Sequence, residues 1–219
     1  MNYIPLHVKT SYSLLTSLND IKKMISYCVK NNISSIAITD DNMYGVMEFY
    51  KECKKNNIKP IIGLELYINN KLVLLYAKNY LGYQNLTKLT YIKQNEELTI
   101  DILKEYSSNL VCITIDLYDE LKDIYEDTYL GYLNINNRPT NTNRTVYINE
   151  VLCMNKDDIT YLKYLHLIKD GKKIANINDY YIHDNCYFDY NIADSENAIE
   201  ISNMCNVEFN ANKNLMPKY

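Results

Sequence analysis

The sequence has few of the residues that interrupt or cross-link a chain. Its 219 residues include 5 glycines, 4 prolines and no tryptophan, and its 6 cysteines form no C-x-x-C pair. The missing spacing argues against a zinc ribbon, a thiol redox motif and a secreted disulfide framework, so we expect buried thiols. No linker, low-complexity block or internal repeat divides the chain. We therefore expect one domain over residues 1–219.

Long apolar runs and an excess of positive charge are also missing. No run of about 18 apolar residues offers a membrane span, and the first residues lack the basic-then-apolar order of a secretory signal. We therefore expect a cytoplasmic protein with no membrane partner. Lys and Arg number 23 against 27 Asp and Glu, which gives a net charge of -4. Because affinity for nucleic acid is mostly cation-driven, we expect any role with DNA to be indirect.

What the sequence does contain is a repeated alternation of short apolar runs and amphipathic stretches. This pattern is typical of an α/β fold with layered or barrel architecture. We predict strands at residues 3–8, 34–39, 58–68, 71–79, 110–115, 128–135 and 145–154. We predict helices at residues 20–31, 44–56, 81–94, 99–106, 117–127, 157–169 and 194–205, with a loop at 136–144. Asn69 and Asn70 should form the tight turn of a hairpin, because asparagine tolerates left-handed backbone.

Helical periodicity predicts which side chains face the interior. The apolar face of the helix at 20–31 is predicted to contain Ile21, Met24, Ile25, Cys28 and Val29. We expect Asn19 to cap this helix, and Asp194 or Ser195 to cap the last one. The side chains expected in the core or in a domain contact are Tyr44, Phe49, Tyr50, Ile61, Ile62 and Leu64.

Polar residues gather where predicted strands end. They are His7 and Lys9 after the first strand, Asp40 and Asp41 after the second, and Glu65 within the third. Barrel and α/β folds collect functional groups at such ends, and imidazole and carboxylate ligands suit zinc, manganese or iron. Strand ends are also polar because they meet solvent. The residue types alone therefore leave a metal site and a solvated rim as alternatives.

Several blocks of the sequence resemble a known family. The first blocks are LHVKTSYSLLTS, IAITDDNMYGVMEFYKECKKNNIKPIIGLELYI and YLGYQNLTKL, and the likeness resumes at INEVLCMNKDD, LIKDGK and AIEISNMCNVEF. In order and spacing they resemble the N-terminal PHP (polymerase and histidinol phosphatase) domain of bacterial DNA polymerase III alpha subunits. The closing LMPKY (215–219) is similar to the hand-off into the polymerase proper. The resemblance implies a PHP domain truncated from a longer polymerase, with a distorted (β/α)7 barrel and a shortened middle segment.

The resemblance also implies a metal site that has lost ligands. Metal-bearing members supply His-x-His, Asp-His, a Glu, further mid-domain ligands and a final Asp-x-His. Here the corresponding positions hold His7 and Lys9, then Asp40 and Asp41, then Glu65, and finally Glu150 and Leu152. The stretch between residues 95 and 145 offers no counterpart of the mid-domain ligands. His166 and His183 match no ligand position, and we expect both on a surface or a helix face.

Lys9 is the most informative of these changes. A protonated ammonium offers only hydrogen-bond donors and cannot coordinate a cation. Carboxylates that converge at a barrel mouth repel one another unless a cation compensates them, and Lys9 could be that cation. We therefore interpret a set of six residues as a vestigial pocket without metal or catalytic residues: His7, Lys9, Asp40, Asp41, Glu65 and Glu150. The alternative is a surviving one-metal site formed by His7, Asp40 and Glu65.

On this resemblance, the chain is part of a DNA-directed DNA polymerase, a nucleotidyltransferase of the DnaE-type branch, with features most like those of low-GC Gram-positive bacteria. We expect the domain itself to be an inactive scaffold without a cofactor. Nucleotidyl transfer would use two magnesium ions in a polymerase palm outside this chain. The expected partners are the remainder of the polymerase chain and a proofreading exonuclease or another replisome subunit.

Two other functions stay open at this point. One is an active metal-dependent PHP 3'-5' exonuclease or phosphoesterase, for which the metal content of protein purified without added metal is a direct test. The other is a stand-alone PHP-like binding protein. A reading frame that continues past Tyr219 into a polymerase would exclude it.

Overall fold

A six-stranded sheet forms the centre of the molecule. The computed structural model describes residues 3–173, 177, 180–183, 185–188 and 196–209. The strands, in spatial as in chain order, are β1 (Ser35–Ile38), β2 (Lys59–Ile68), β3 (Lys71–Ala77), β4 (Leu110–Thr114), β5 (Asp127–Tyr132) and β6 (Thr145–Tyr147). Strand β3 runs antiparallel to both of its neighbours, and the other neighbouring pairs are parallel.

Residues 5–9 close this sheet into a barrel. On one side, the backbone N–H groups of Ala37 and Thr39 donate to the carbonyls of Pro5 and Val8 at 3.0 and 2.8 Å. On the other side, residues 7–9 exchange two backbone hydrogen bonds with Val151, which follows β6. The segment therefore takes the seventh position, although it forms an isolated bridge and not the regular strand predicted at 3–8. Pro5 has no N–H group to donate to a ladder.

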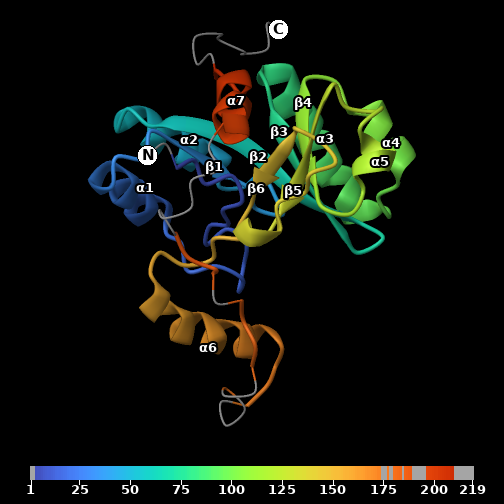
Figure 1. Ribbon diagram of the computed structural model, residues 1–219. Helices are drawn as coiled ribbons and strands as arrows, with labels where there is room; N and C mark the ends of the chain where they lie inside the picture. The colour runs from blue at the N-terminus through green and yellow to red at the C-terminus, as the bar shows by residue number, and fades with distance from the viewer. Residues whose placement is uncertain (1–2, 174–176, 178–179, 184, 189–195, 210–219) are drawn as a thin grey trace, which may run out of the picture.

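Alternation along the strands separates two cores. In β2, Ile61 packs in a cluster inside the barrel, whereas Ile62 and Leu64 pack in the outer cluster beneath the helices. Ala198 and Ile201 of α7 (Glu196–Met204) join the inner cluster. In Figure 1, α7 lies at the end of the barrel opposite α6 (Ile159–Lys169). Helix α7 therefore closes one end of the barrel and leaves polar residues at the other.

The remaining helices follow the predicted order. They are α1 (Ile21–Lys30), α2 (Val46–Lys55), α3 (Tyr80–Asn95), α4 (Ile100–Glu105) and α5 (Tyr118–Leu121), with 3-10 turns at Ile135–Asn137 and Lys156–Asp158. The helix predicted at 117–127 is only the four-residue α5, and the chain turns before it enters β5 at Asp127. The strand predicted at 145–154 is regular only through Tyr147.

The hairpin turn has the conformation that its residues predict. Asn69 and Asn70 have φ angles of 48° and 62°, in the left-handed region. They connect β2 and β3, whose register runs from Ile68 opposite Lys71 to Gly63 opposite Tyr76. A Cβ at Gly63 would lie 2.8 Å from the Tyr76 ring. Glycine therefore allows the Tyr76 side chain to cross the barrel interior and donate to the Leu6 carbonyl.

Two predictions about α1 are wrong. Asp20, not Asn19, caps the helix, because its side chain accepts from the Lys23 N–H. The Asn19 amide is buried and donates to the carbonyls of Lys9 and Val151, where it braces the closure of the barrel. Val29 is 50% exposed and lies off the buried face. The caps proposed at Asp194 or Ser195 lie outside the described residues, as does the segment 215–219.

Most of the predicted core residues are buried. Phe49, Ile61, Ile62 and Leu64 are inaccessible to solvent, and Tyr50 is half-buried. Tyr44 is 70% exposed and does not belong to the core. The six cysteines are buried thiols.

A third, smaller apolar cluster supports α6, which stands away from the barrel in Figure 1. It contains Leu152, Cys153, Leu162, Ile182 and Cys186. Among the described helices, none is both long and apolar enough to cross a bilayer.

Candidate functional site

Four polar side chains meet at the end of the barrel that α7 leaves open. His7 and Lys9 come from the closing segment, Glu65 points inward from β2, and Glu150 precedes the bridge at Val151. Residue 65 shares the inward face of β2 with Ile61 and Gly63, because side chains alternate along a strand. The fold thus brings together residues that lie up to 143 positions apart.

Glu65 is the centre of this cluster. The His7 Nε2 atom lies 2.6 Å from Glu65 Oε2, and the Lys9 Nζ atom lies 2.7 Å from Glu65 Oε1. Lys9 Nζ also lies 3.1 Å from Glu150 Oε1. The Lys9 and Glu65 side chains are only 9% and 2% exposed, whereas Glu150 is 32% exposed. Lys9 therefore bridges a buried carboxylate and one at the edge of solvent.

The contacts fix the protonation of the cluster. Since Glu65 is an acceptor, His7 must carry a proton on Nε2, and its buried Nδ1 has no hydrogen-bond partner among the described residues. Burial disfavours the charged form of Lys9, but Glu65 and Glu150 outweigh it and raise the lysine pKa. Burial acts against ionised Glu65 as well, but His7 and Lys9 lower its pKa overall. Burial and the Glu65 charge raise the pKa of Tyr67 to about 12.

Asp40 belongs to a separate network. Its carboxylate accepts from the Thr10 N–H at 2.7 Å, and from the hydroxyls of Thr10 and Ser13 at 2.6 Å each. Burial nevertheless raises its pKa. Asp41 is exposed, where its side chain accepts from the Asn42 amide and its carbonyl accepts from Lys93 Nζ at 2.7 Å. Of the six residues predicted as one pocket, four form a direct cluster, and Asp40 and Asp41 have other partners.

Asp40→Asn is expected to change the free energy of unfolding at pH 7 by no more than about 1 kcal/mol. An amide keeps an oxygen for the Thr10 N–H and the Ser13 hydroxyl and removes a charge that burial disfavours, which offsets weaker hydrogen bonds. Because the folded pKa is raised, Asp40 contributes stability at low pH that is lost as pH rises through that pKa. Urea unfolding at pH 7 and pH 4 measures both effects. If the variant lost more than about 3 kcal/mol of unfolding free energy at pH 7, the hydrogen bonds to the Asp40 carboxylate would outweigh the cost of burying its charge.

A metal ion would have to compete with Lys9. Ligand atoms of His7, Glu65 and Glu150 all lie within 4.8 Å of one another, which is the one such group of three among the described residues. However, the Lys9 ammonium contacts one oxygen of each carboxylate, and His7 contacts the other oxygen of Glu65. While Lys9 is charged, it occupies an oxygen of each carboxylate that a metal would need. The trio of His7, Asp40 and Glu65 is not assembled, because Asp40 is held by Thr10 and Ser13.

The other predicted positions contribute no ligand to the cluster. Leu152 is buried in the small cluster beside α6. His166 lies on α6 with its Nε2 atom 2.8 Å from the Thr16 carbonyl, and the exposed His183 ring lies 5.5 Å from that of Tyr181. These placements agree with the expectation of a surface or a helix face.

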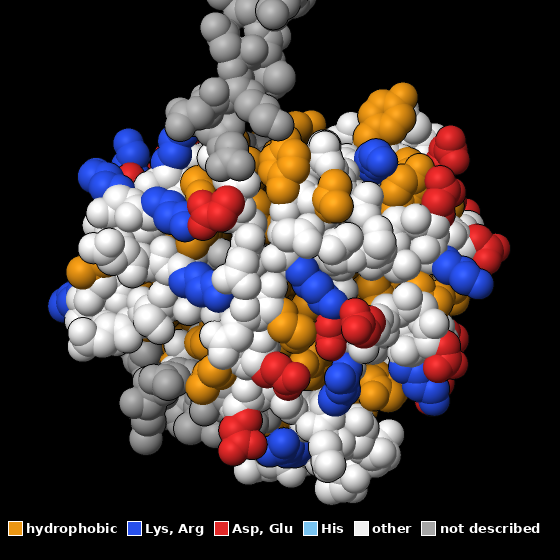
Figure 2. All heavy atoms as spheres, turned by 90° about the horizontal axis from the view of Figure 1, so that it is seen from above, with side chains coloured by type: hydrophobic (Ala, Val, Ile, Leu, Met, Phe, Trp, Pro, Cys, Tyr) orange, Lys and Arg blue, Asp and Glu red, His pale blue; other side chains and the backbone are white. Residues whose placement is uncertain are grey.

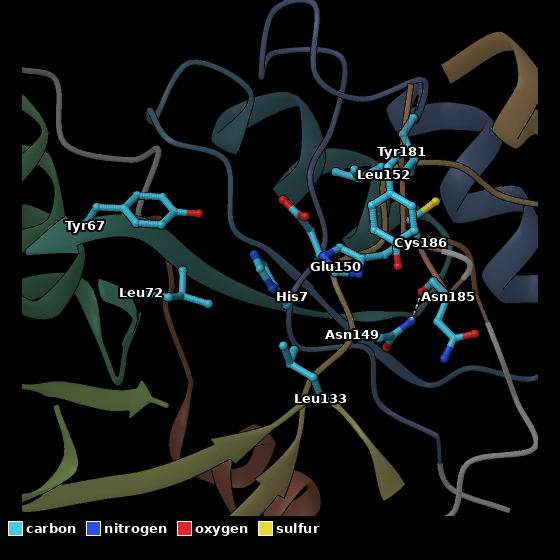
Figure 3. A pocket seen from close by; sticks show the side chains of 12 residues that line it. His7, Tyr67, Leu72, Leu133, Asn149, Glu150, Leu152, Tyr181, Asn185 and Cys186 are labelled. Atoms are coloured by element: carbon cyan, nitrogen blue, oxygen red, sulfur yellow. Dashed lines mark hydrogen bonds between the residues drawn. The ribbon is translucent and has the colours of Figure 1, made fainter. Parts of the chain in front are cut away.

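A cavity of about 340 Å³ adjoins the cluster. Figure 3 shows His7 and Glu150 near its centre, Tyr67 and Leu72 on one side, and Cys186 on the other. Tyr67 was missed in the sequence, although it lies two positions after Glu65 and a period of two would have indicated it. Thr10 and Ser13 were also missed, and nothing in the sequence pattern pairs them with Asp40.

Comparison with known proteins gives matches along most of the chain. Residues 5–193 match the PHP domain family. The chain is 31% identical over 236 aligned residues to DNA polymerase III subunit alpha of Staphylococcus aureus (strain MRSA252), and 29% identical over 233 to that of Staphylococcus epidermidis. Each alignment covers 98% of this chain and 22% of the relative. The chain thus spans about a fifth of the length of these relatives.

A likeness to solved structures is weak. A protein of Bifidobacterium adolescentis, provisionally described as a metal-dependent phosphoesterase, superposes with a TM-score of 0.42 and 8% identity, over 58% of this chain and 77% of that one. A likeness of this size supports no conclusion about function.

Proposed function

Because the chain belongs to the PHP domain family, and so has the α/β fold of that family, we propose that it is the N-terminal PHP domain of a DNA polymerase III alpha subunit and serves there as a non-catalytic scaffold. The observation that carries the proposal is the Lys9 ammonium, within 3.1 Å of both Glu65 and Glu150. In this position a side chain of the protein supplies the positive charge that a metal would otherwise provide.

The electrostatics of the cluster support a structural role. Lys9 and Glu65 neutralise each other in a buried place, where an uncompensated charge would be strongly unfavourable. The pKa shifts hold both groups in their charged forms at neutral pH. A general base must be able to gain and lose a proton near pH 7, and so must a water bound to a catalytic metal. An ion pair locked in this way contributes to closure of the barrel, with His7 and Lys9 each holding one oxygen of Glu65.

Contact with DNA in this role is indirect. The chain has a net charge of -4. On the face drawn in Figure 2, acidic and basic side chains are mixed and form no continuous basic surface. Tight binding to DNA needs several lysines or arginines placed to meet phosphates. The proposed partners are therefore the polymerase chain that follows and a proofreading exonuclease or another replisome subunit, with the two-magnesium chemistry in the polymerase palm.

The purified chain is expected to release no nucleotides from a primer end and to hydrolyse no phosphomonoester, with manganese, zinc or iron supplied. Lys9 occupies the carboxylates that a metal would need, and Leu152 offers no ligand. The measurement is a gel assay with end-labelled DNA, together with metal content after purification without added metal. Metal-dependent cleavage that Glu65→Ala abolishes would overturn the scaffold proposal.

A reconstructed site provides the positive control. In the double variant Lys9→His and Leu152→His, imidazoles replace the ammonium and the leucine, so measurable zinc or manganese binding is expected by calorimetry. The matched control is Leu152→His alone, which keeps the ammonium and should not bind. Equal binding by the single and double variants would show that Lys9 is not what keeps a metal out.

The second candidate function is an active phosphoesterase or exonuclease. It is favoured by a specific observation, the convergence of His7, Glu65 and Glu150 ligand atoms within 4.8 Å. It requires Lys9 to leave the carboxylates or lose its proton. One equivalent of tightly bound metal in the unmodified protein would favour this function.

A further inference from the structure

Two of the six cysteines lie side by side beneath the barrel mouth. The backbone N–H groups of Leu152 and Cys153 both donate to the Cys186 carbonyl, at 2.8 and 3.1 Å. Cys153 forms a parallel bridge with Tyr187, the next residue along, and its Sγ atom lies 3.5 Å from the Cys186 carbonyl oxygen. Both side chains pack in the apolar cluster beside α6. The two thiols therefore share one small compartment.

The spacing of the two segments is compatible with a disulfide, since Cys186 is one residue from Tyr187, the bridge partner of Cys153. Hydrogen-bonded neighbouring segments run about 4.8 Å apart, and a disulfide needs Cα atoms about 4.4 to 6.8 Å apart. Interaction with Cys186, together with burial, raises the Cys153 pKa. A cross-link here would join two segments that are already hydrogen-bonded to each other.

Cys186 is also reachable by a small oxidant. It lines the cavity of about 340 Å³ at the barrel mouth, although it is only 2% exposed. Cys153 does not line that cavity. In Figure 3, Cys186 lies beside Leu152 and Tyr181, across the cavity from Tyr67. A peroxide that enters the cavity would therefore meet Cys186 and not Cys153.

We propose that Cys153 and Cys186 form a reversible, peroxide-driven disulfide that fastens the cavity wall to the barrel. The Cys186 sulfur attacks the peroxide, the O–O bond breaks, and a sulfenic acid and water form. The Cys153 sulfur then attacks the sulfenyl sulfur, an S–S bond forms, and the S–O bond breaks. The hydroxide leaves as water with the Cys153 proton. Two thiols and one hydrogen peroxide thus give one disulfide and two waters, and an external dithiol reverses the reaction.

The bond would close a ring that contains α6. Residues 153–186 include that helix and the cavity-lining residues Tyr181 and Ile182. Cross-linking restricts the unfolded chain more strongly as the closed loop lengthens. We therefore expect oxidation to raise the melting temperature by about 5 °C or more. The raised Cys153 pKa leaves little Cys153 thiolate at neutral pH, so its attack on the sulfenyl sulfur should be slow.

The test treats the 219-residue protein with hydrogen peroxide, blocks the remaining thiols with N-ethylmaleimide in denaturant, and maps peptides by mass spectrometry. The expected result is a Cys153–Cys186 cross-linked peptide, a fall from six thiols to four, and recovery of six thiols with dithiothreitol. Six unreacted thiols after treatment would overturn the proposal. So would oxidation of Cys186 to sulfinic acid without a cross-link.

A second pair in the same molecule is the internal comparison. Cys28 and Cys53 are close enough to influence each other's charge, but both are fully buried and neither lines the cavity at the barrel mouth. This pair should stay reduced. If it were oxidised as fast as Cys153 and Cys186, access through the cavity would not explain the reaction. In Cys153→Ser, Cys186 should stop at the sulfenic acid, which dimedone traps. If that variant does not fold, the peptide map of the unmodified protein decides.

Discussion

Lys9→Ala is expected to lower the free energy of unfolding by about 3 to 5 kcal/mol at pH 7, the usual loss when one partner of a buried ion pair is removed. The variant leaves Glu65 ionised in a place only 2% exposed, with Glu150 nearby and no cation to compensate. Lys9→Met keeps most of the side-chain stem and separates the loss of charge from the loss of packing. Urea unfolding followed by circular dichroism measures both variants.

Lys54 offers a matched control for this experiment. Its Nζ atom lies 2.6 Å from Glu208 Oε1, about as close as Lys9 lies to Glu65, but the two side chains are 45% and 63% exposed. Solvent screens such a pair, so Lys54→Ala should lose at most about 1 kcal/mol. Similar losses for Lys9→Ala and Lys54→Ala would mean that burial does not strengthen the Lys9 contacts.

The Lys9 effect should depend on pH with a defined sign. In the unmodified protein the Glu65 pKa is lowered, so its stabilisation is present above the unfolded value of 4.5 and is lost as pH falls through the folded pKa. The Lys9 pKa is raised, so its stabilisation is present below 10.5 and is lost as pH rises through the folded pKa. The difference between Lys9→Ala and the unmodified protein should thus be largest between about pH 5 and 10, and should shrink in acid.

Phe49→Ala is expected to lower the free energy of unfolding by about 3 to 5 kcal/mol, because it leaves a cavity that the surroundings only partly fill. Phe49 lies on α2 with no solvent exposure, in the outer core between the helices and the sheet. The removed ring loses its burial and its dispersion contacts together. Thermal and urea unfolding measure the effect.

Tyr44→Ala, two residues before α2, is the control for Phe49→Ala. Tyr44 is 70% exposed, and its hydroxyl accepts a 3.3 Å hydrogen bond from Gln94. Its loss should stay within about 0.5 kcal/mol, as is usual for a surface position. A Phe49→Ala protein as stable as the Tyr44→Ala protein would show that the buried face of α2 is assigned wrongly.

Local patterns predicted the order of the elements well. The sequence pattern predicted β2, β3, α2 and α3 to within a few residues, because β2 and β3 are apolar runs buried on both faces and each helix buries one face. The hairpin was predictable because Asn69 and Asn70 both tolerate positive φ. The N-cap of α1 was missed by one residue, since Asn19 and Asp20 are equally good capping types and only the barrel closure decides between them.

The sequence predicted which residue types form the site, but not which of these residues contact one another. The resemblance to the PHP family indicated Lys9 and Glu150, and the geometry places both against Glu65. That Asp40 is separate depends on the path of residues 10–17 after the first strand, which no periodicity describes. Along this path the hydroxyls of Thr10 and Ser13 lie against Asp40 and donate hydrogen bonds to its carboxylate.

The closing segment also sets the order in which the barrel can be completed. Residues 5–9 are made first, but one of their two neighbours is Val151, which is synthesised more than 140 residues later. Until Val151 has been made, one side of the segment has no strand to pair with. The cluster of His7, Lys9 and Glu65 also lacks Glu150 until that point. Contacts so distant in sequence make folding slow and leave an edge open to wrong pairing. During synthesis, residues 5–9 are therefore the part of the sheet whose pairing is completed last.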